Sequence, residues 1–172
     1  FGPHTPGFIT VKYGCSKSIE SAINKNTAAV LIEPIQGEGG IIVPPDNYLK
    51  EVREICTKHN VLMLLDEIQS GLGRTGKLFA YQHSCGGCNC DIGCNEDQSR
   101  ESKPDGLILG KALGGGFMPV SCFLTSKEVM QWMDPGSHGS TFGGNPLAAA
   151  LAKRSLESVS YTHLRAHETP IN

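Results

Sequence analysis

An acidic residue and a lysine follow two apolar runs of this sequence, and their side chains suit a shared chemical task. Asp66 comes directly after residues 61–65, and Lys111 comes directly after residues 107–110. Short apolar runs of this kind predict strands of a parallel sheet that are buried on both faces. Because ligands of open α/β sheets bind beyond the carboxyl ends of the strands, we expect both residues at a ligand-binding edge. The alternative for Asp66 is a cap for the following turn.

The surroundings of Lys111 favour a chemical role over a solvated surface lysine. Apolar residues and glycines bracket it in the sequence Leu-Ile-Leu-Gly-Lys-Ala-Leu-Gly-Gly-Gly. Removal of water from a lysine favours its neutral amine, and a neutral amine attacks carbonyl carbon. We therefore expect Lys111 to be a desolvated nucleophile.

Two further segments carry polar groups in suitable places. Residues 28–32 predict another buried strand, which leads into Glu33, and Glu38 follows in a glycine-rich turn. Residues 136–146 are rich in glycine and hydroxyl groups, including Ser140 and Thr141. Such a loop can offer N–H and hydroxyl groups to a phosphate, or it can be a plain turn before the next helix.

The hydrophobic pattern predicts an α/β fold, a mostly parallel sheet with flanking helices. An apolar stripe over residues 46–59 predicts a helix between two strands, and a strand–helix–strand order implies parallel strands with a right-handed crossover. We expect Asp46, Ser126 and Asn145 to cap helices. The expected strands are residues 8–11, 28–32, 61–65, 107–110 and 120–124, and the expected helices are residues 18–24, 46–59, 126–132 and 147 to about 158.

Composition narrows the classes of protein. The chain has 172 residues, of which 39% are hydrophobic and 19% charged, so it can form one globular core. A net charge of −2 gives no reason to expect nucleic acid or an anionic membrane as partner. No apolar run approaches the roughly 20 residues of a membrane span, and no signal peptide is visible. We expect a cytoplasmic, reducing setting.

Residues 71–77 offer a rival interpretation, because they match the GxxxxGK core of a phosphate-binding loop. Two details count against a nucleotide hydrolase. Leu78 stands where a serine or threonine must bind magnesium, and residues 66–70 separate the loop from the strand that it should follow directly.

Four cysteines form a second rival site. Cys85, Cys88, Cys90 and Cys94 lie within ten positions, beside glycines. Such a cluster can bind zinc tetrahedrally or hold an iron–sulfur cluster, and a structural metal-binding module is the corresponding function. The alternatives are a surface insertion with metal-free thiols, or two disulfides in an oxidising setting.

Five motifs in order resemble the class III aminotransferases of fold type I, which use pyridoxal phosphate. The resemblance implies the central part of the family's cofactor-binding large domain over residues 1–158, with a cysteine-rich insertion at about residues 84–103. Residues 159–172 form an atypical tail. The matching motifs are EPIQGE at 33–38, LDEIQSG at 65–71, GRTG at 73–76, LGKALGGG at 109–116 and HGSTFGGNP at 138–146.

The resemblance also implies how the cofactor is held. Lys111 resembles the lysine that forms the Schiff base with pyridoxal phosphate and moves the proton. Asp66 resembles the aspartate that pairs with the pyridinium nitrogen, and Gln69 the residue near the phenolic oxygen. Thr141, with Ser140, is similar to the phosphate contact that reaches the neighbouring subunit's cofactor, which implies a homodimer.

Within the family, residues 1–8 and 135–141 resemble the branch that transfers the δ-amino group of ornithine to 2-oxoglutarate. That reaction gives glutamate semialdehyde and glutamate, and Glu33 and Glu38 resemble its substrate-side acids. Acetylornithine and 4-aminobutyrate are the alternative amino donors. Because the family's N-terminal cofactor loop and C-terminal small domain lie outside these residues, we expect a fragment that is inactive alone.

Overall fold

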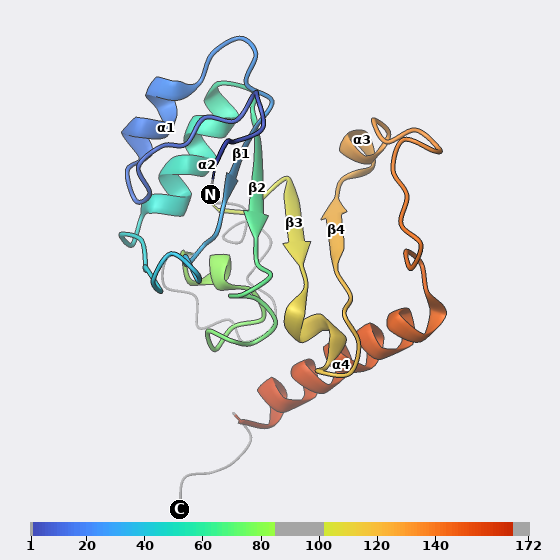
Figure 1. The fold of residues 1–172 in the computed structure, drawn as a ribbon. Coiled ribbons are helices and arrows are strands. Elements are labelled where there is room, and N and C mark those ends of the chain that lie inside the picture. Colours follow the sequence, from blue (N-terminus) through green and yellow to red (C-terminus); the bar gives the residue numbers. More distant parts are fainter. Residues whose placement is uncertain (1, 85–101, 167–172) are drawn as a thin grey trace, which may run out of the picture.

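The described part of the chain forms one four-stranded sheet with helices beside it (Figure 1). The computed structural model describes residues 2–84 and 102–166, with side chains up to residue 159. The first three strands are parallel and the last is antiparallel to its neighbour, which confirms the predicted α/β class and mostly parallel sheet. In spatial order the strands are β1 (Ala29–Ile32), β2 (Leu62–Asp66), β3 (Gly106–Leu109) and β4 (Cys122–Thr125).

The amphipathic helix between β1 and β2 forms as its apolar stripe predicts. It is α2 (Tyr48–Lys58), and α1 (Ser16–Ala22) packs against it. The expected cap Asp46 is wrong by one position, since Asn47 is the N-cap and makes no side-chain capping bond. The apolar stripe of α2 packs on the sheet, and the shared core includes Ile19, Leu49, Val52, Cys56, Met63 and Leu65.

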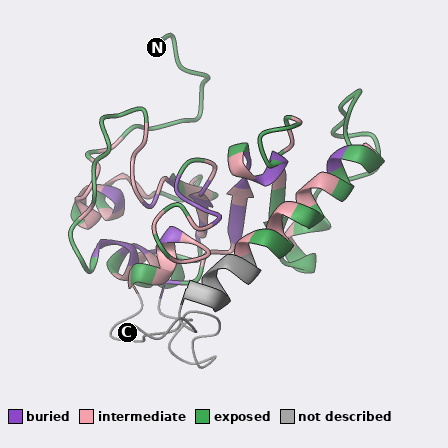
Figure 2. Cartoon of the chain, turned by 90° about the horizontal axis from the view of Figure 1, so that it is seen from below, coloured by how far each residue is buried: buried purple, intermediate pink, exposed green. Residues whose placement is uncertain are grey.

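The central strand β2 is buried unevenly, which corrects the expectation of two buried faces. Met63 and Leu65 are fully buried, whereas Leu62 and Leu64 are only half-buried. Helix α2 covers the face of the sheet that carries Met63 and Leu65. Figure 2 shows the buried residues gathered around the sheet, while much of the long C-terminal helix is exposed. The alternation continues past the strand, because Asp66 is half-buried and the next side chain is buried.

A charged pair joins α2 to the start of β3. The Arg53 guanidinium lies 2.7 Å from Asp105 Oδ2, and the same oxygen accepts a hydrogen bond from the Met63 N–H at 2.7 Å. The Asp105 main-chain carbonyl accepts the Thr125 hydroxyl at 2.7 Å. One residue therefore connects a helix with three strands at the end of the sheet opposite Asp66.

The remaining elements partly differ from the expectations. No strand forms over residues 8–11, where Phe8 and Ile9 are exposed and no described strand pairs with them. Ser126 caps α3 as expected, and Asn145 caps α4 through the N–H groups of Leu147 and Ala148. The helices are α3 (Lys127–Met130), shorter than expected, α4 (Pro146–Ala166), which extends past residue 158, and the 3-10 helices η1 (Ala80–Ser84) and η3 (Lys111–Gly114).

Candidate active site

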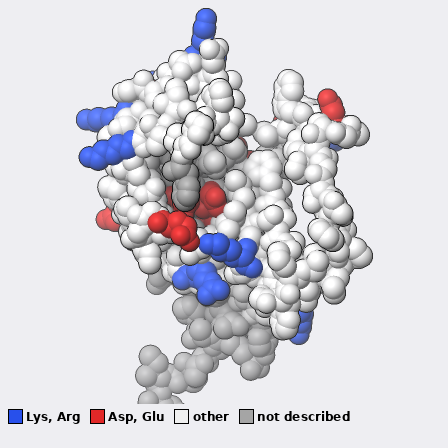
Figure 3. Space-filling view, in the orientation of Figure 1, with Lys and Arg blue, Asp and Glu red and all other residues white. Residues whose placement is uncertain are grey.

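The parallel strands bring three of the predicted site residues, Asp66, Lys111 and Glu33, to one edge of the sheet. Asp66 ends β2 and pairs in register with Ile108 of β3, and Lys111 begins η3 two residues after β3 ends. Glu33 follows β1, the next strand on the other side of β2. Figure 3 shows acidic and basic side chains gathered where β2 ends, on a face that is otherwise mostly uncharged.

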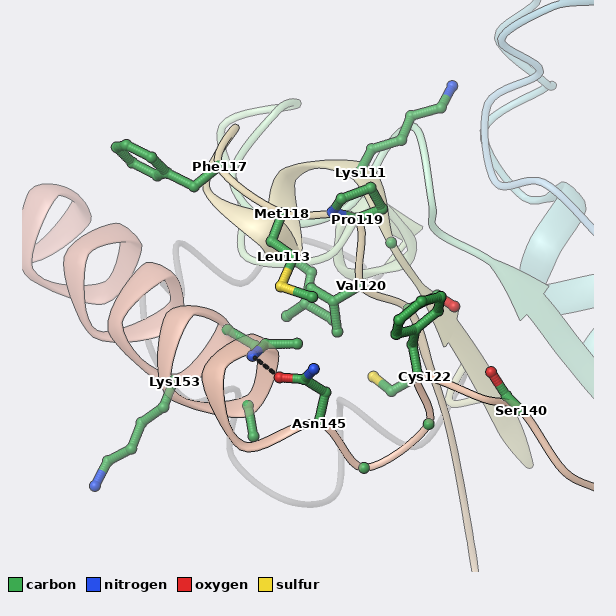
Figure 4. A pocket seen from close by; sticks show the side chains of 18 of the residues that line it. Lys111, Leu113, Phe117, Met118, Pro119, Val120, Cys122, Ser140, Asn145 and Lys153 are labelled. Carbon is green, nitrogen blue, oxygen red and sulfur yellow. Dashed lines mark hydrogen bonds between the residues drawn. The ribbon is translucent and has the colours of Figure 1, made fainter.

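Lys111 has an unusual backbone and a specific partner. Its φ is +43°, a left-handed conformation that residues other than glycine adopt at a cost. The amine donates a hydrogen bond to Gln69 Oε1. The expectation of a desolvated lysine is wrong for the described residues, because the side chain is exposed and points away from the neighbouring cavity (Figure 4). A hydrogen-bonded neighbour, rather than apolar burial, restrains this amine.

Asp66 takes part in the turn that follows β2. Its Oδ1 accepts the Ile68 N–H at 3.0 Å, so the capping role that the sequence left open is present. One bond occupies one oxygen of the carboxylate, and the side chain is only half-buried. Capping is therefore compatible with a second role, and it fixes the orientation of the carboxylate at the edge of the sheet.

The two acids after β1 differ in their surroundings. Glu33 is half-buried, and its Oε2 accepts the Gly37 N–H at 2.8 Å, which closes a tight turn. Residues Gln36 and Ile42 form an isolated antiparallel bridge that holds the two ends of the following loop together. Glu38 lies within that loop and is exposed. Of the pair, Glu38 has the side chain that is open to a ligand.

Glu67 is a feature that we did not predict. Its side chain is 1% exposed. Burial raises the pKa of its carboxyl group, against the opposing effect of three hydrogen-bond donors. These are the N–H groups of Ala80 and Tyr81 and the hydroxyl of Ser70, each at 2.9 Å. The period-2 alternation of β2 was a usable signal, because it puts position 67 on the face of Met63 and Leu65.

The loop that resembles a phosphate-binding loop has another architecture. Residues 71–79 form a series of turns, and a 3-10 helix follows them rather than an α-helix. The Lys77 amine donates to the main-chain carbonyl of Gln82 at 3.2 Å. A phosphate loop must lead into a helix whose N-terminus faces the nucleotide, so this segment does not support the rival interpretation.

Ser140 and Thr141 lie in the long exposed connection between α3 and α4. Ser140 and Lys111 both border an open cavity of 1590 Å³. Figure 4 shows their side chains on different sides of it, with Lys111 directed outward. Within the described part of this chain, Thr141 is exposed and does not line that cavity. The cavity wall is mostly apolar, with Leu113, Met118, Val120, Ala149 and Leu156.

The predicted metal site of Cys85, Cys88, Cys90 and Cys94 lies outside the described residues. Among residues 2–84 and 102–166, no group of three or more potential metal ligands occurs. The three cysteines in those ranges, Cys15, Cys56 and Cys122, are free thiols, and burial raises the pKa of Cys56 to about 11.

The family model for the class III aminotransferases matches residues 1–169. The chain belongs to this family. Ornithine aminotransferase 2 of Staphylococcus saprophyticus is 52% identical over 159 residues, which are 92% of this chain and 36% of that protein. Ornithine aminotransferase of an Exiguobacterium strain is 51% identical over 164 residues, which are 95% of this chain and 37% of that protein.

Solved structures agree with the family assignment. The ornithine aminotransferase of Toxoplasma gondii superposes with a TM-score of 0.81 at 44% identity, covering 95% of this chain and 35% of that one. The acetylornithine aminotransferase of Elizabethkingia anophelis gives 0.79 at 47% identity, covering 93% and 38%. This class III aminotransferase chain thus spans little more than a third of the length of these relatives. None of the helices in the described part of the chain has the length and hydropathy of a membrane span.

Proposed function

We propose that this chain is part of a pyridoxal-phosphate-dependent enzyme that transfers the δ-amino group of ornithine to 2-oxoglutarate. The main support is the hydrogen-bonded amine of Lys111, which lies at the carboxyl edge of the sheet that also presents Asp66. Identity of 52% to an ornithine aminotransferase supports the choice of amino donor. The products are glutamate semialdehyde and glutamate.

The side chains at this edge fit pyridoxal phosphate by their chemistry. Lys111 offers a primary amine for the cofactor's carbonyl carbon, and Asp66 offers a carboxylate for its ring nitrogen. When bound, the cofactor supplies an electron sink for the substrate carbon. Asp66 would keep a proton on the ring nitrogen, because a nearby negative charge favours the protonated form. Lys111 would move the proton at the substrate carbon, and Gln69 would orient the amine of Lys111.

Glu33 and Glu38 are our candidates for the substrate side. Both follow β1, and the exposed side chain of Glu38 can approach a substrate, whereas Glu33 stabilises the turn between them. Acetylornithine is the main alternative donor, since a structure of that activity is 47% identical. 4-Aminobutyrate is the other alternative.

We further propose a homodimer in the cytoplasm. Ser140 and Thr141 lie on an exposed loop, and the neighbouring Phe142 is 75% exposed. A second copy would cover this apolar surface and receive Thr141 at its own cofactor phosphate. The free thiols of Cys15, Cys56 and Cys122 suit a reducing compartment.

Binding of the cofactor tests the function directly. We would add pyridoxal phosphate to the full-length protein that carries this chain, record its absorbance spectrum, reduce with borohydride and locate the label by peptide mass. We expect a band near the visible edge and a label on Lys111. Lys111→Ala should lose both, while Lys127→Ala, a change in an exposed lysine of α3, should keep both.

The same band can rank the amino donors. We expect ornithine to bleach it faster than acetylornithine or 4-aminobutyrate, and 2-oxoglutarate to restore it. A band that persists in Lys111→Ala would contradict the role of the lysine. Faster bleaching by acetylornithine would leave the aminotransferase class intact and change the substrate.

A further inference from the structure

Gly37 lies against the side chain that holds the amine of Lys111. A Cβ atom added at Gly37 would be 2.8 Å from Gln69 Cγ and 3.4 Å from both Cβ and Cδ of Gln69. Contacts below 3.0 Å are essentially absent for real Cβ atoms. Gly37 is not among the residues with a positive φ, so its backbone conformation does not require glycine. The neighbouring Gln69 side chain does.

The turn that contains Gly37 is anchored and cannot easily withdraw. Its N–H donates to Glu33 Oε2 at 2.8 Å, and its carbonyl accepts the N–H groups of Gly40 and Ile41, both at 3.1 Å. Gln36 and Ile42 exchange two backbone hydrogen bonds at 3.0 Å just outside it. An added methyl group would therefore displace Gln69 rather than the turn.

Displacement of Gln69 would reach the amide group that binds Lys111. The closest atom, Cγ, is one bond from Cβ, so Gln69 relieves the contact only by rotating about its first side-chain bond. That rotation moves the whole amide, including the Oε1 that accepts the Lys111 hydrogen bond. The far end of a flexible side chain could move without this consequence, but Cγ is not the far end.

We propose that Gly37 is a positioning residue, which keeps Gln69 in the rotamer that orients the amine of Lys111. Through the anchored turn, Glu33 shares this role. The inference deepens the proposed function, on which it rests for the view that Lys111 is the reacting lysine. The contacts among Gly37, Gln69 and Lys111 exist in the chain without cofactor, so they can be tested separately.

The test measures how fast Lys111 reacts with acetic anhydride in the full-length, cofactor-free protein, with peptide mass spectrometry to follow each lysine. Gln69→Ala frees the amine, and we expect its labelling to rise about 2- to 12-fold, as expected for one lost hydrogen bond. Gly37→Ala should raise the rate to the same extent. Gly39→Ala is the matched control in the same turn, because its added Cβ would only reach ordinary contact, 3.4 Å from Gln36.

The double variant Gly37→Ala/Gln69→Ala shows whether Gly37→Ala acts on Lys111 through the side chain of Gln69. Gln69→Ala removes Cγ, the atom that is 2.8 Å from the added Cβ, so Gly37→Ala should change nothing further in that background. If Gly37→Ala alone folds poorly, the double variant should restore folding, as measured by circular dichroism.

Three outcomes would overturn the proposal. They are wild-type labelling in Gly37→Ala, wild-type labelling in Gln69→Ala, and a double variant that labels faster or folds worse than Gln69→Ala. Failure of the proposed function has a different signature, since wild-type protein would then not retain pyridoxal phosphate on Lys111 whatever the labelling pattern.

Discussion

The buried carboxyl group of Glu67 leads to a specific prediction about the loop that follows β2. The end of the loop returns to β2, where the N–H groups of Ala80 and Tyr81 donate to this side chain. Ser70 donates to the same Oε2 that Ala80 uses, and Tyr81 donates to Oε1. Glu67 therefore joins the end of β2 to the start of η1, which lies 13 residues further along the chain.

The substitution Glu67→Gln keeps the shape and removes the charge. An amide has one oxygen, so its NH₂ group must face either the N–H of Tyr81 or the pair formed by Ala80 and Ser70. In both orientations one backbone N–H loses its acceptor. The protonated acid does not have this defect, because a hydroxyl oxygen can still accept. We expect the change to cost about 1–3 kcal/mol in the local opening of the loop.

The cost should depend on pH in a defined direction. Because burial raises the pKa of Glu67, the folded protein keeps this proton where the unfolded loop has lost it. The stabilisation is therefore complete below the ordinary carboxyl pKa and falls as the pH rises through the folded value. Glutamine does not titrate. The difference between wild type and Glu67→Gln should be largest near about pH 4 and should shrink toward neutral pH.

Hydrogen exchange of the Ala80 and Tyr81 amides measures this directly. Comparison of both proteins at the same pH cancels the intrinsic pH dependence of exchange, and 1–3 kcal/mol corresponds to about 5- to 150-fold faster exchange in the variant. Glu54→Gln, a change in an exposed carboxylate of α2, is the matched control and should not alter exchange. A variant-to-wild-type ratio that grows with rising pH would refute the reasoning, because the three donors would then outweigh burial.

Substitutions at three other positions test contacts of the sheet and its helices, each by urea unfolding. Arg53→Met should lower the free energy of unfolding by about 1–3 kcal/mol, because it leaves Asp105 without its cation, while the 34% exposure of that side chain limits the loss; an unchanged midpoint would argue against the pair. Gly106→Ala should cost about 1–3 kcal/mol, since its Cβ would lie 2.6 Å from both Leu64 and Phe123, and a stability equal to wild type would show that both side chains move freely. Asn145→Ala should cost about 1 kcal/mol through loss of the α4 cap, and Asn145→Ser should recover part of it.

The strands that could be predicted were those with apolar side chains in unbroken runs. Residues 61–65 and 107–110 predicted β2 and β3 to within one residue, because a run of that length has few other stable arrangements. Residues 8–11 look similar in composition, yet they form no strand. A strand needs a hydrogen-bonded neighbour, and the composition of a segment does not indicate whether it has one. Pairing is a tertiary property.

The edge of the sheet that carries the candidate site could be predicted from the order of the strands, whereas the exposure of Lys111 could not. Parallel strands put Asp66 and Lys111 at the same end of the sheet, as expected. The apolar neighbours of Lys111 in the sequence suggested burial of its amine, but Leu113 points into the core while Lys111 points outward. Lys111 begins a 3-10 turn with a left-handed backbone. A local pattern in the sequence contains no information about such a turn.

Glu67 and Gly37 show which features of the candidate site can and cannot be predicted from the sequence. Glu67 could have been found from the sequence, because the alternation of β2 puts position 67 in the core, where a carboxylate must have donors. Gly37 could not, since the reason for its glycine is a side chain 32 positions later in the chain. Both residues act through others: one fixes the loop after β2, and the other leaves space for Gln69. A substitution at Gly37 should therefore move Gln69, and one at Glu67 should loosen the loop after β2, although neither replaces a residue with a proposed chemical role.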